Sequence, residues 1–342
     1  YVTVPRLTYE FEHGPVPYVG VPGEAGDQIM VGFLEGDRDT VVAIFPGSGG
    51  GSGAIENTIL VAASDSRQEI KDKADFVCDG TTDVTTLRSA VFSIDPFQTS
   101  GAVGGRVMLA AGTYNVAVTP TEQVLIANGI VIEGEGRSTV INVTKTSYTA
   151  YHTAAFNVWG TGKVKNMHFT LKNQSVYGNS AVELSADQAH VENCTFSGLG
   201  TDTGSGSLLD SHYVFSDTSG GNQTISECKF FDFVPSSDIA MSDWSAVYTR
   251  GADIISCVFD SFGDYGGGVV SAEFPVAIHV DSPSSECAIR DNEIYGSFIW
   301  LQEPYQTQVT GNRIWYEDNG VTTRPERPLI WIDGRASGVR SS

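Results

Sequence analysis

A six-residue pattern of apolar and polar positions recurs six times after Val143. Each copy has an apolar first residue, a polar residue or glycine third, Cys, Asn or Met fourth, and Phe or Ile sixth. The copies begin at Val164, Val191, Ile225, Ile254, Ile289 and Val309. Their starts are 20 to 35 residues apart, which is typical of one solenoid coil with loops of variable length. The pattern predicts two short strands joined by a bend at the third residue, with the first, fourth and sixth side chains pointing inward.

Stacked coils place equivalent residues above one another, so the fourth positions should form ladders. We expect an amide ladder at Asn292 and Asn312 and a sulfur ladder at Cys194, Cys228 and Cys257. Buried thiols behave as small apolar groups, and the odd total of five Cys does not suit a disulfide framework. Disulfides between stacked cysteines are the alternative. No paired Cys or His at metal-ligand spacing is present, so no metal site is predicted.

The residue that follows each copy should face outward. These residues are Thr170, Ser197, Phe231, Asp260, Tyr295 and Trp315. The column becomes aromatic toward the C-terminus, where Trp244 and Trp300 also lie and where no Lys follows Lys229. A subunit interface, rich in aromatic residues and poor in Lys, would explain this composition. A platform on which sugar rings stack would explain it as well, so Trp244, Tyr295, Trp300 and Trp315 are the candidate glycan-binding or trimer-interface residues.

Residues 74–143 read as the entry into the stack of coils. Thr82 or Asp83 can cap a helix. Leu87, Ala90, Val91 and Ile94 follow as one apolar stripe. Such a stripe can cover the open first coil of a solenoid, because an uncovered strand edge invites aggregation. Short strands are predicted at 106–110 and 130–133, with turns at 111–114 and at Gly134 and Gly136.

The same residues carry a family resemblance. The order ADFVCDGTTD, helix, GGRVMLAAGTYNV, GIVIEGEGRSTVI resembles the opening of the pectate-lyase-like superfamily of right-handed parallel β-helices. It is most similar to the versions found in bacteriophage tailspikes and minor tail proteins. The resemblance covers about 70 residues. It implies an all-β fold, a homotrimer in the virion, and binding or cleavage of polysaccharide.

The first 73 residues differ in character from the rest. Strands at 27–33 and 40–45 around the acidic turn 34–39 predict a β-hairpin. The string PGEAGDQIMVGFLEGDRDTVVAIF resembles the OB-fold of phage baseplate hub and spike proteins, although an ordinary hairpin would explain it too. GSGGGSG at 47–53 has linker composition, and a short strand (55–63) and a polar helix (65–73) follow. We therefore expect an OB-like attachment module at 1–46, a linker with a short helix at 47–73, and the β-helix at 74–342.

Composition restricts the partners. The chain has 342 residues, 38 Gly and a formal net charge of −21. A surface this acidic repels nucleic acid and, more weakly, anionic membranes and polysaccharides. No apolar run is long enough to span a bilayer, and no signal peptide is visible. Unpaired cysteines suit synthesis in a reducing cytoplasm.

Catalytic chemistry is weakly indicated. Glycoside hydrolysis needs two carboxylates on either side of one bond, and the acidic residues chosen for testing are Asp238, Asp243, Asp260 and Asp264. In a chain with 41 acidic residues, such a group also arises by chance. The NTDG, DD, GHG and RIK motifs of polygalacturonases and the clustered Asp of pectate lyases are absent. The five His between residues 152 and 279 show no triad partner by spacing, and no cofactor is predicted. The resemblance therefore transfers the scaffold and not the catalysis.

Together these features predict a phage virion tail protein, made in the host cytoplasm, that projects from the tail and binds a host-surface glycan. The expected partners are two further copies of the chain, other tail or baseplate proteins contacted through the N-terminal module, and host polysaccharide. A polysaccharide depolymerase on the same β-helix is the first alternative. A purely structural virion component is the second.

Overall fold

The computed structural model describes most of the chain from residue 57 onward and one hairpin before it. The described residues are 30–33, 41–44, 57–94, 104–119, 123–127, 129–145, 153–171, 179–198, 211–216, 222–231, 233, 244–261, 276–281, 286–304, 306–315, 329–333 and 340–341. The chain divides into two compact units, Tyr1–Ile55 and Glu56–Ser342. Each unit is described by itself.

The first unit contains one antiparallel strand pair. Strand β1 (Met30–Phe33) pairs with β2 (Val41–Ile44), with Met30 opposite Ile44. This confirms the hairpin that the alternation of residues predicted. The acidic turn, the remainder of the OB-like module and the glycine linker lie outside the described residues.

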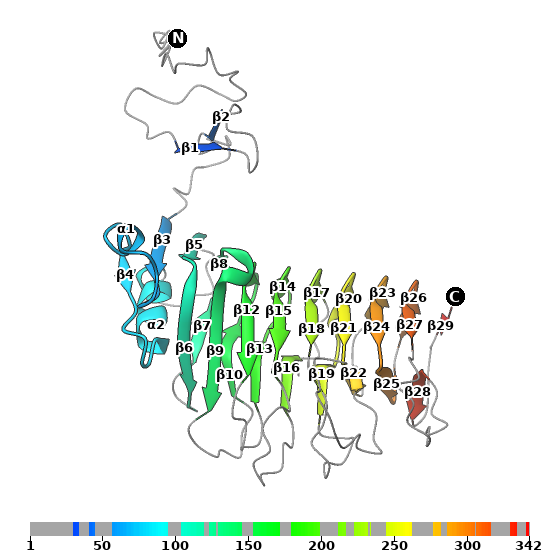
Figure 1. Cartoon of the computed structure of the whole chain (residues 1–342). Helices are drawn as coiled ribbons and strands as arrows, with labels where there is room; N and C mark the ends of the chain where they lie inside the picture. The colour runs from blue at the N-terminus through cyan, green and yellow to red at the C-terminus, as the bar shows by residue number, and fades with distance from the viewer. Residues whose placement is uncertain are drawn as a thin grey trace, which may run out of the picture. The chain divides into compact units, whose positions relative to one another are not determined.

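Strands of the second unit form three long parallel sheets, shown coil by coil in Figure 1. Sheet I contains, in spatial order, β4 (Phe76–Val77), β3 (Asn57–Ala62), β5 (Gly105–Leu109), β8 (Ile130–Gly134), β11 (Lys163–Lys165), β14 (His190–Glu192), β17 (Thr224–Ser226), β20 (Asp253–Ile255), β23 (Cys287–Arg290), β26 (Thr307–Thr310) and β29 (Arg340–Ser341). Sheet II contains β6 (Gly112–Val118), β9 (Thr139–Lys145), β12 (His168–Leu171), β15 (Thr195–Ser197), β18 (Lys229–Phe231), β21 (Val258–Asp260), β24 (Glu293–Tyr295) and β27 (Arg313–Trp315). Sheet III contains β7 (Val124–Ile126), β10 (Thr153–Val158), β13 (Asn179–Leu184), β16 (Ser211–Ser216), β19 (Trp244–Thr249), β22 (Val276–Asp281), β25 (Phe298–Gln302) and β28 (Ile330–Asp333).

The chain visits sheets I, II and III in turn and then returns to sheet I one coil further along. Every strand pairing in this unit is parallel, as between β12 and β15 and between β24 and β27. Crossovers between parallel strands are right-handed because twisted strands pack back onto their sheet only that way. The fold is therefore a right-handed parallel β-helix, as the repeat and the family resemblance predicted.

One helix covers the first coil. Besides the short helix α1 (Gln68–Lys71) and the 3₁₀ turn η1 (Gly136–Ser138), the described chain contains α2 (Val84–Ile94). The four residues of its predicted apolar stripe are all buried, and the helix packs against β3, β5, β6 and β7. Asp83, directly before the helix, accepts hydrogen bonds from the backbone N–H groups of Gly80 at 2.9 Å and Asn115 at 2.7 Å. Its carboxylate thereby ties the start of the cap to the first coil.

The predicted turn at 111–114 is shorter than expected. Strand β6 begins at Gly112, and the Tyr114 side chain is fully buried in the first coil. The Tyr114 hydroxyl donates to the carbonyl oxygens of Val61 and Ala110, both at 2.9 Å. Tyr114 therefore belongs to the core and not to the turn, because its phenol finds hydrogen-bond partners inside.

Equivalent side chains stack inside the solenoid. The rings of Phe169, Phe196, Phe230 and Phe259 lie at centroid distances of 5.0, 4.9 and 4.7 Å with interplanar angles below 10°. These separations match the spacing of about 4.8 Å between neighbouring strands. The sixth position of the repeat therefore builds a continuous aromatic column in the core.

The third position of the repeat makes the predicted bend. All six residues there have positive φ: Asn166 (56°), Asn193 (48°), Glu227 (55°), Ser256 (53°), Asp291 (58°) and Gly311 (66°). A left-handed residue reverses the side-chain alternation at this point, which turns the fourth side chain back inside. Asn, Asp and Gly adopt this conformation with the least strain, which explains their predominance.

The fourth position forms the predicted ladders. Cys194, Cys228 and Cys257 are buried and free, as are Cys78 and Cys287. Burial raises the pKa of the Cys228 and Cys257 thiols well above the usual range. At the next two coils, the Asn292 side-chain amide donates to Asn312 Oδ1 at 2.8 Å. The cysteines are therefore structural.

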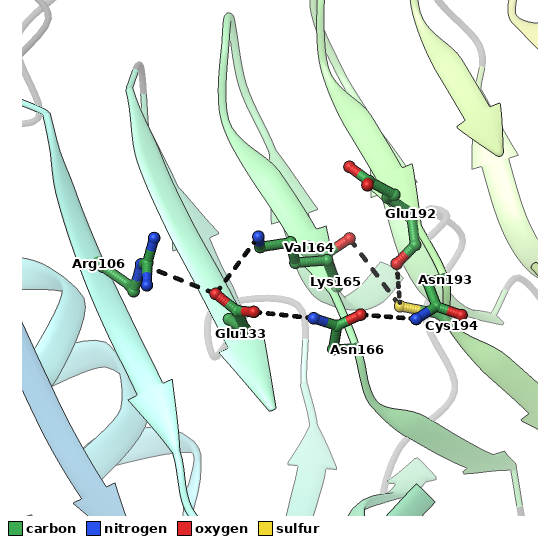
Figure 2. A network of polar contacts seen from close by, with 8 residues as sticks. All are labelled: Arg106, Glu133, Val164, Lys165, Asn166, Glu192, Asn193 and Cys194. Carbon is green, nitrogen blue, oxygen red and sulfur yellow. Dashed lines mark hydrogen bonds and ion pairs between the residues drawn. The ribbon is translucent and has the colours of Figure 1, made fainter. Parts of the chain in front are cut away.

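A second ladder of side chains crosses neighbouring strands on the outer side of sheet I, as Figure 2 shows. Arg106 and Lys165 reach the Glu133 carboxylate from the coils on either side, at 3.7 and 3.4 Å. Asn166 donates to Glu133 Oε1, and Asn193 donates to Asn166 Oδ1, each at 2.8 Å. The N-terminal coils are thus linked through side chains as well as through their backbones.

The strand β28 (Ile330–Asp333) continues the solenoid. Strand β28 pairs with β25 of the same chain, placing Ile330 beside Ile299 and Trp331 beside Trp300. Although the segment before it breaks the repeat in sequence, this strand is an ordinary member of sheet III.

Candidate functional site

The outer face of sheet II carries the column predicted to face outward. Thr170 pairs with Ser197, Phe231 with Asp260, Asp260 with Tyr295, and Tyr295 with Trp315. None of these side chains is in the core, and the last is exposed. The prediction of an outward column is confirmed, and its character changes from polar to aromatic along the sheet.

Tyr295 and Trp315 form a parallel stack at the C-terminal end of this column. Their ring centroids are 4.6 Å apart and their planes differ by 6°. Trp315 is 38% exposed and lies on β27, which is the edge strand of sheet II among the described residues. One face of the indole is therefore covered by the Tyr295 ring, and the opposite face points away from the coils.

Charged groups flank the stack two residues earlier on the same strands. Tyr295 Oη donates to Glu293 Oε2 at 3.3 Å, and Arg313 Nη1 lies 3.8 Å from Glu293 Oε1. The Arg313 and Glu293 side chains are 71% and 41% exposed. Partial desolvation, and next the Glu293 carboxylate, raise the pKa of the Tyr295 phenol. The phenol therefore stays protonated near neutral pH and acts as a donor.

Nearer the N-terminal end of the same column, Arg137 covers the ring of Phe231. The guanidinium carbon of Arg137 lies 5.7 Å from the centroid of Phe231, within the range of a cation–π contact. His168 lies in a neighbouring column, where burial and then the Arg137 charge lower the pKa of its imidazole. The N-terminal part of the face is thus occupied by the chain's own side chains.

Two histidines make contacts that their spacing in sequence did not reveal. His168 Nε2 lies 2.9 Å from Ser197 Oγ, and His190 Nε2 lies 3.1 Å from Ser226 Oγ. Each pair joins adjacent coils. A nucleophilic serine needs, besides its histidine, a group that orients the base and donors for an oxyanion. Among the described contacts of these pairs no such set occurs, and we assign them a role in coil pairing.

Trp300 and Trp244 lie on sheet III. Trp300 belongs to a second column, in which Phe215, Tyr248, His279, Trp300 and Trp331 follow one another in register. The His279 and Trp300 rings stack at 4.1 Å, yet only 2% and 6% of these residues are exposed. Trp244 begins β19, opposite Ser211. Of the four aromatic candidates, Tyr295 and Trp315 therefore come together, while Trp300 is buried on another sheet.

Sheet III also carries a polar cluster that the sequence did not indicate. Tyr248 Oη donates to Asp281 Oδ2 at 2.6 Å, and Arg250 Nη2 donates to the same oxygen at 3.3 Å. Burial acts to raise the pKa of Asp281, but these hydrogen bonds outweigh it and hold the pKa below its usual range. The cluster fastens β19 to β22.

Of the four proposed catalytic carboxylates, the described residues include Asp260 alone. It lies in register with Tyr295, on the outer face of sheet II. Asp238, Asp243 and Asp264 lie outside the described residues. Glu293 is a carboxylate that sequence reasoning missed. It lies on the strand next to that of Asp260, two residues before Tyr295. By strand geometry, the Cα atoms of Asp260 and Glu293 are about 8 Å apart.

Within the described ranges, no three His, Cys, Asp or Glu side chains gather in a way that could hold a metal ion. Among the described helices, none has the length and apolar character needed to cross a bilayer.

Comparison with known proteins gives structural similarity only. No family model matches the sequence, and no curated protein matches it. Solved structures that resemble it include ORF18 of Geobacillus virus E2, at 14% identity and a TM-score of 0.34, covering 77% of this chain and 58% of that one. An iota-carrageenase in complex with iota-carrageenan fragments is 15% identical, with a TM-score of 0.37 and coverages of 75% and 55%. An alginate lyase from Paenibacillus sp. str. FPU-7 is 12% identical, with a TM-score of 0.32 and coverages of 83% and 99%.

The chain thus spans little more than half the length of the first two of these proteins. The assignment of the fold rests on the strand pairing of the chain itself.

Proposed function

We propose that this chain is a bacteriophage virion tail protein that binds a host-surface glycan through the C-terminal part of sheet II. We call this surface, formed by Asp260, Glu293, Tyr295, Arg313 and Trp315, the sheet II platform. The observation that carries the proposal is the parallel stack of Tyr295 and Trp315, in which the indole remains 38% exposed.

The platform has the chemistry that sugar recognition requires. Flat aromatic rings suit the apolar faces of pyranose rings, and a few placed polar groups fix the orientation of a ligand. The Arg313 guanidinium is largely exposed beside the rings, and the Glu293 carboxylate is partly exposed. Because Tyr295 supports one face of Trp315, the indole is held in place before a ligand arrives, which reduces the entropy lost on binding.

The assignment to a virion tail is supported by the resemblance of residues 74–143 to the entry segments of phage tail β-helices. The structure of this segment, with α2 covering the first coil, is consistent with it. In this proposal the N-terminal unit attaches the protein to other tail or baseplate proteins, and three copies of the chain assemble into one spike.

Glycan binding is tested by measuring the binding of the full chain to an array of bacterial surface polysaccharides. Replacing Trp315 with Ala should reduce binding about 5- to 150-fold, if a stacked sugar ring contributes the roughly 1–3 kcal/mol that a stacked nucleic-acid base does. The matched control is Trp159→Ala, which removes another exposed indole (49%) directly after β10. Equal binding by both variants contradicts the proposal.

Oligomeric state separates this role from the alternative of a subunit interface. Light scattering should give the mass of a trimer for the wild-type chain and for Trp315→Ala alike. If Trp315→Ala instead releases monomers, the exposed stack belongs to the interface and not to a glycan site.

A depolymerase is the second candidate, favoured by the placement of Asp260 and Glu293 on neighbouring strands beside the platform. Both side chains lie on the outer face of sheet II, on adjacent strands, and inverting glycosidases use two carboxyl groups on either side of the bond that they cut. Release of reducing ends from a bound glycan, abolished by Asp260→Asn and by Glu293→Gln, would establish this activity. Binding without release in the wild type excludes it for that glycan.

A further inference from the structure

Two outward columns end together on strand β27. In one column Glu293 is followed by Arg313, and in the other Tyr295 is followed by Trp315, as the register of β24 and β27 shows. The first column pairs opposite charges and the second pairs parallel rings. Both columns thus end at the edge of sheet II on a group with an exposed side: a guanidinium and an indole.

Arg313 is weakly engaged within the chain. Its contact with Glu293 is long, at 3.8 Å, and its side chain is 71% exposed. Exposed ion pairs of this kind contribute little to stability. Because the side chain is 71% exposed, most of the five N–H donors of the guanidinium face solvent. Arg313 and Trp315 lie two residues apart on one strand and on the same face, a separation of about 7 Å between their Cα atoms. A long arginine side chain can cover that distance toward a ligand seated on the indole.

Electrostatics differ at this end of the chain. Residues 1–289 contain 34 acidic and 14 basic residues, whereas residues 290–342 contain 7 acidic and 6 basic residues, all six of them arginines. The described residues among 290–342 include four acidic residues and three arginines, so the excess negative charge that disfavours anionic ligands elsewhere is small in this part of the chain. An anion therefore meets less repulsion at this edge than on the rest of the surface, and the nearby negative charges are those of Asp260 and Glu293.

We propose that this edge binds a sugar ring that bears a carboxylate, with the ring stacked on the free face of Trp315 and the carboxylate paired with Arg313. The ligand extends each column by one group. Its sugar ring follows the rings of Tyr295 and Trp315, and its carboxylate follows the Arg313 guanidinium. Arginine suits a carboxylate because its planar fork can donate two parallel hydrogen bonds. This inference rests on the proposed glycan-binding function and specifies the class of sugar.

The experiment compares ligands that differ only in this charge. Oligosaccharides containing glucuronic or galacturonic acid, and the methyl esters of the same oligosaccharides, are printed side by side and probed with the full chain. The wild type should bind the free acids at least tenfold more tightly than the esters, and this ratio should fall as salt is raised. Arg313→Gln should bring the ratio close to one, and Arg313→Lys should retain part of it.

Glu293→Gln provides a readout that a merely structural role of Arg313 would not produce. Removing the competing carboxylate should raise the ratio of free-acid to ester binding above that of the wild type. Circular dichroism should be the same for all variants, because neither side chain lies in the core.

Three outcomes decide between the inferences. Equal binding of acids and esters, or a ratio that persists in Arg313→Gln, overturns the carboxylate proposal. If esters or neutral glycans nevertheless bind and Trp315→Ala abolishes that binding, the proposed function stands without it. If no glycan binds in a Trp315-dependent manner, both proposals fail.

Discussion

The buried side-chain amide of Asn292 donates to Asn312 Oδ1, one coil further along, at 2.8 Å. The same amide donates to the Ile254 carbonyl at 3.0 Å, and its oxygen accepts the backbone N–H of Cys257 at 2.8 Å. One side chain thus connects three successive coils at the bend between sheets I and II. In the preceding coils the same position holds cysteines.

Asn292→Ala should lower the free energy of unfolding by about 2–4 kcal/mol, because it leaves the buried backbone groups of Ile254 and Cys257 without partners. Asn292→Cys should cost less, since a thiol at this position can donate to a carbonyl, as Cys257 does to Ile255 at 3.4 Å. Urea denaturation measures both. The exposed Gln308→Ala is the control, and an Asn292→Ala variant as stable as this control would contradict the ladder.

Phe230 and Phe231 are neighbours in sequence that face opposite sides of sheet II. Phe230 is fully buried between Phe196 and Phe259, whereas Phe231 lies under Arg137 on the outer face. Phe230→Ala should destabilise the fold by about 3–5 kcal/mol through the cavity that it creates. Phe231→Ala should cost about 1 kcal/mol or less, mainly the cation–π contact. Thermal unfolding of the two variants tests this, and similar losses would mean that the inward and outward assignment is wrong.

Glu227 occupies a left-handed position that suits it poorly. Its φ is 55°, and it is exposed, in the place where the two preceding coils have Asn166 and Asn193. Glu227→Asn should raise stability by about 0.5 kcal/mol, because Asn tolerates this conformation better. Glu227→Val should lower it by about 1–2 kcal/mol, since a β-branched residue is strained there. A higher melting temperature for Glu227→Val would contradict the left-handed conformation at this position.

The Tyr248–Asp281 hydrogen bond should appear in the pH dependence of stability. The pKa of Asp281 is lowered in the folded chain, so the ionised carboxylate stabilises the fold above its unfolded pKa of about 3.9. This contribution is lost as the pH falls through the lower, folded-state pKa. Tyr248→Phe should therefore cost about 1 kcal/mol at pH 7, after allowance for partial exposure. The difference from the wild type should shrink below about pH 4; a gap that stays constant with pH would contradict this account.

Much of sheet II could be predicted from the sequence because its repeat is local. Six consecutive residues specify a strand, a left-handed bend and the next strand, so the inward and outward positions of Phe259 and Asp260 can be read without knowing the loops. The column of Tyr248, His279 and Trp300 on sheet III was not predicted. Connections of different lengths precede those strands, and the register across coils is fixed by backbone pairing and core packing rather than by spacing in sequence.

The candidate site was predicted in part for the same reason. Tyr295 and Trp315 follow directly on copies of the repeat, and their shared column was evident. Glu293 and Arg313 occupy the fifth position of the repeat, which has no preferred residue type, so nothing singled them out. That they flank the stack depends on three-dimensional register.

The central claim is that the exposed stack of Tyr295 and Trp315 is where the protein binds a host-surface glycan. The most direct test is the binding of the wild-type chain, Trp315→Ala and Trp159→Ala to the polysaccharide array under identical conditions. We predict at least about a fivefold loss for Trp315→Ala and wild-type binding for Trp159→Ala. Glycan binding that survives in Trp315→Ala, or a wild-type chain that binds nothing on the array, would contradict the claim.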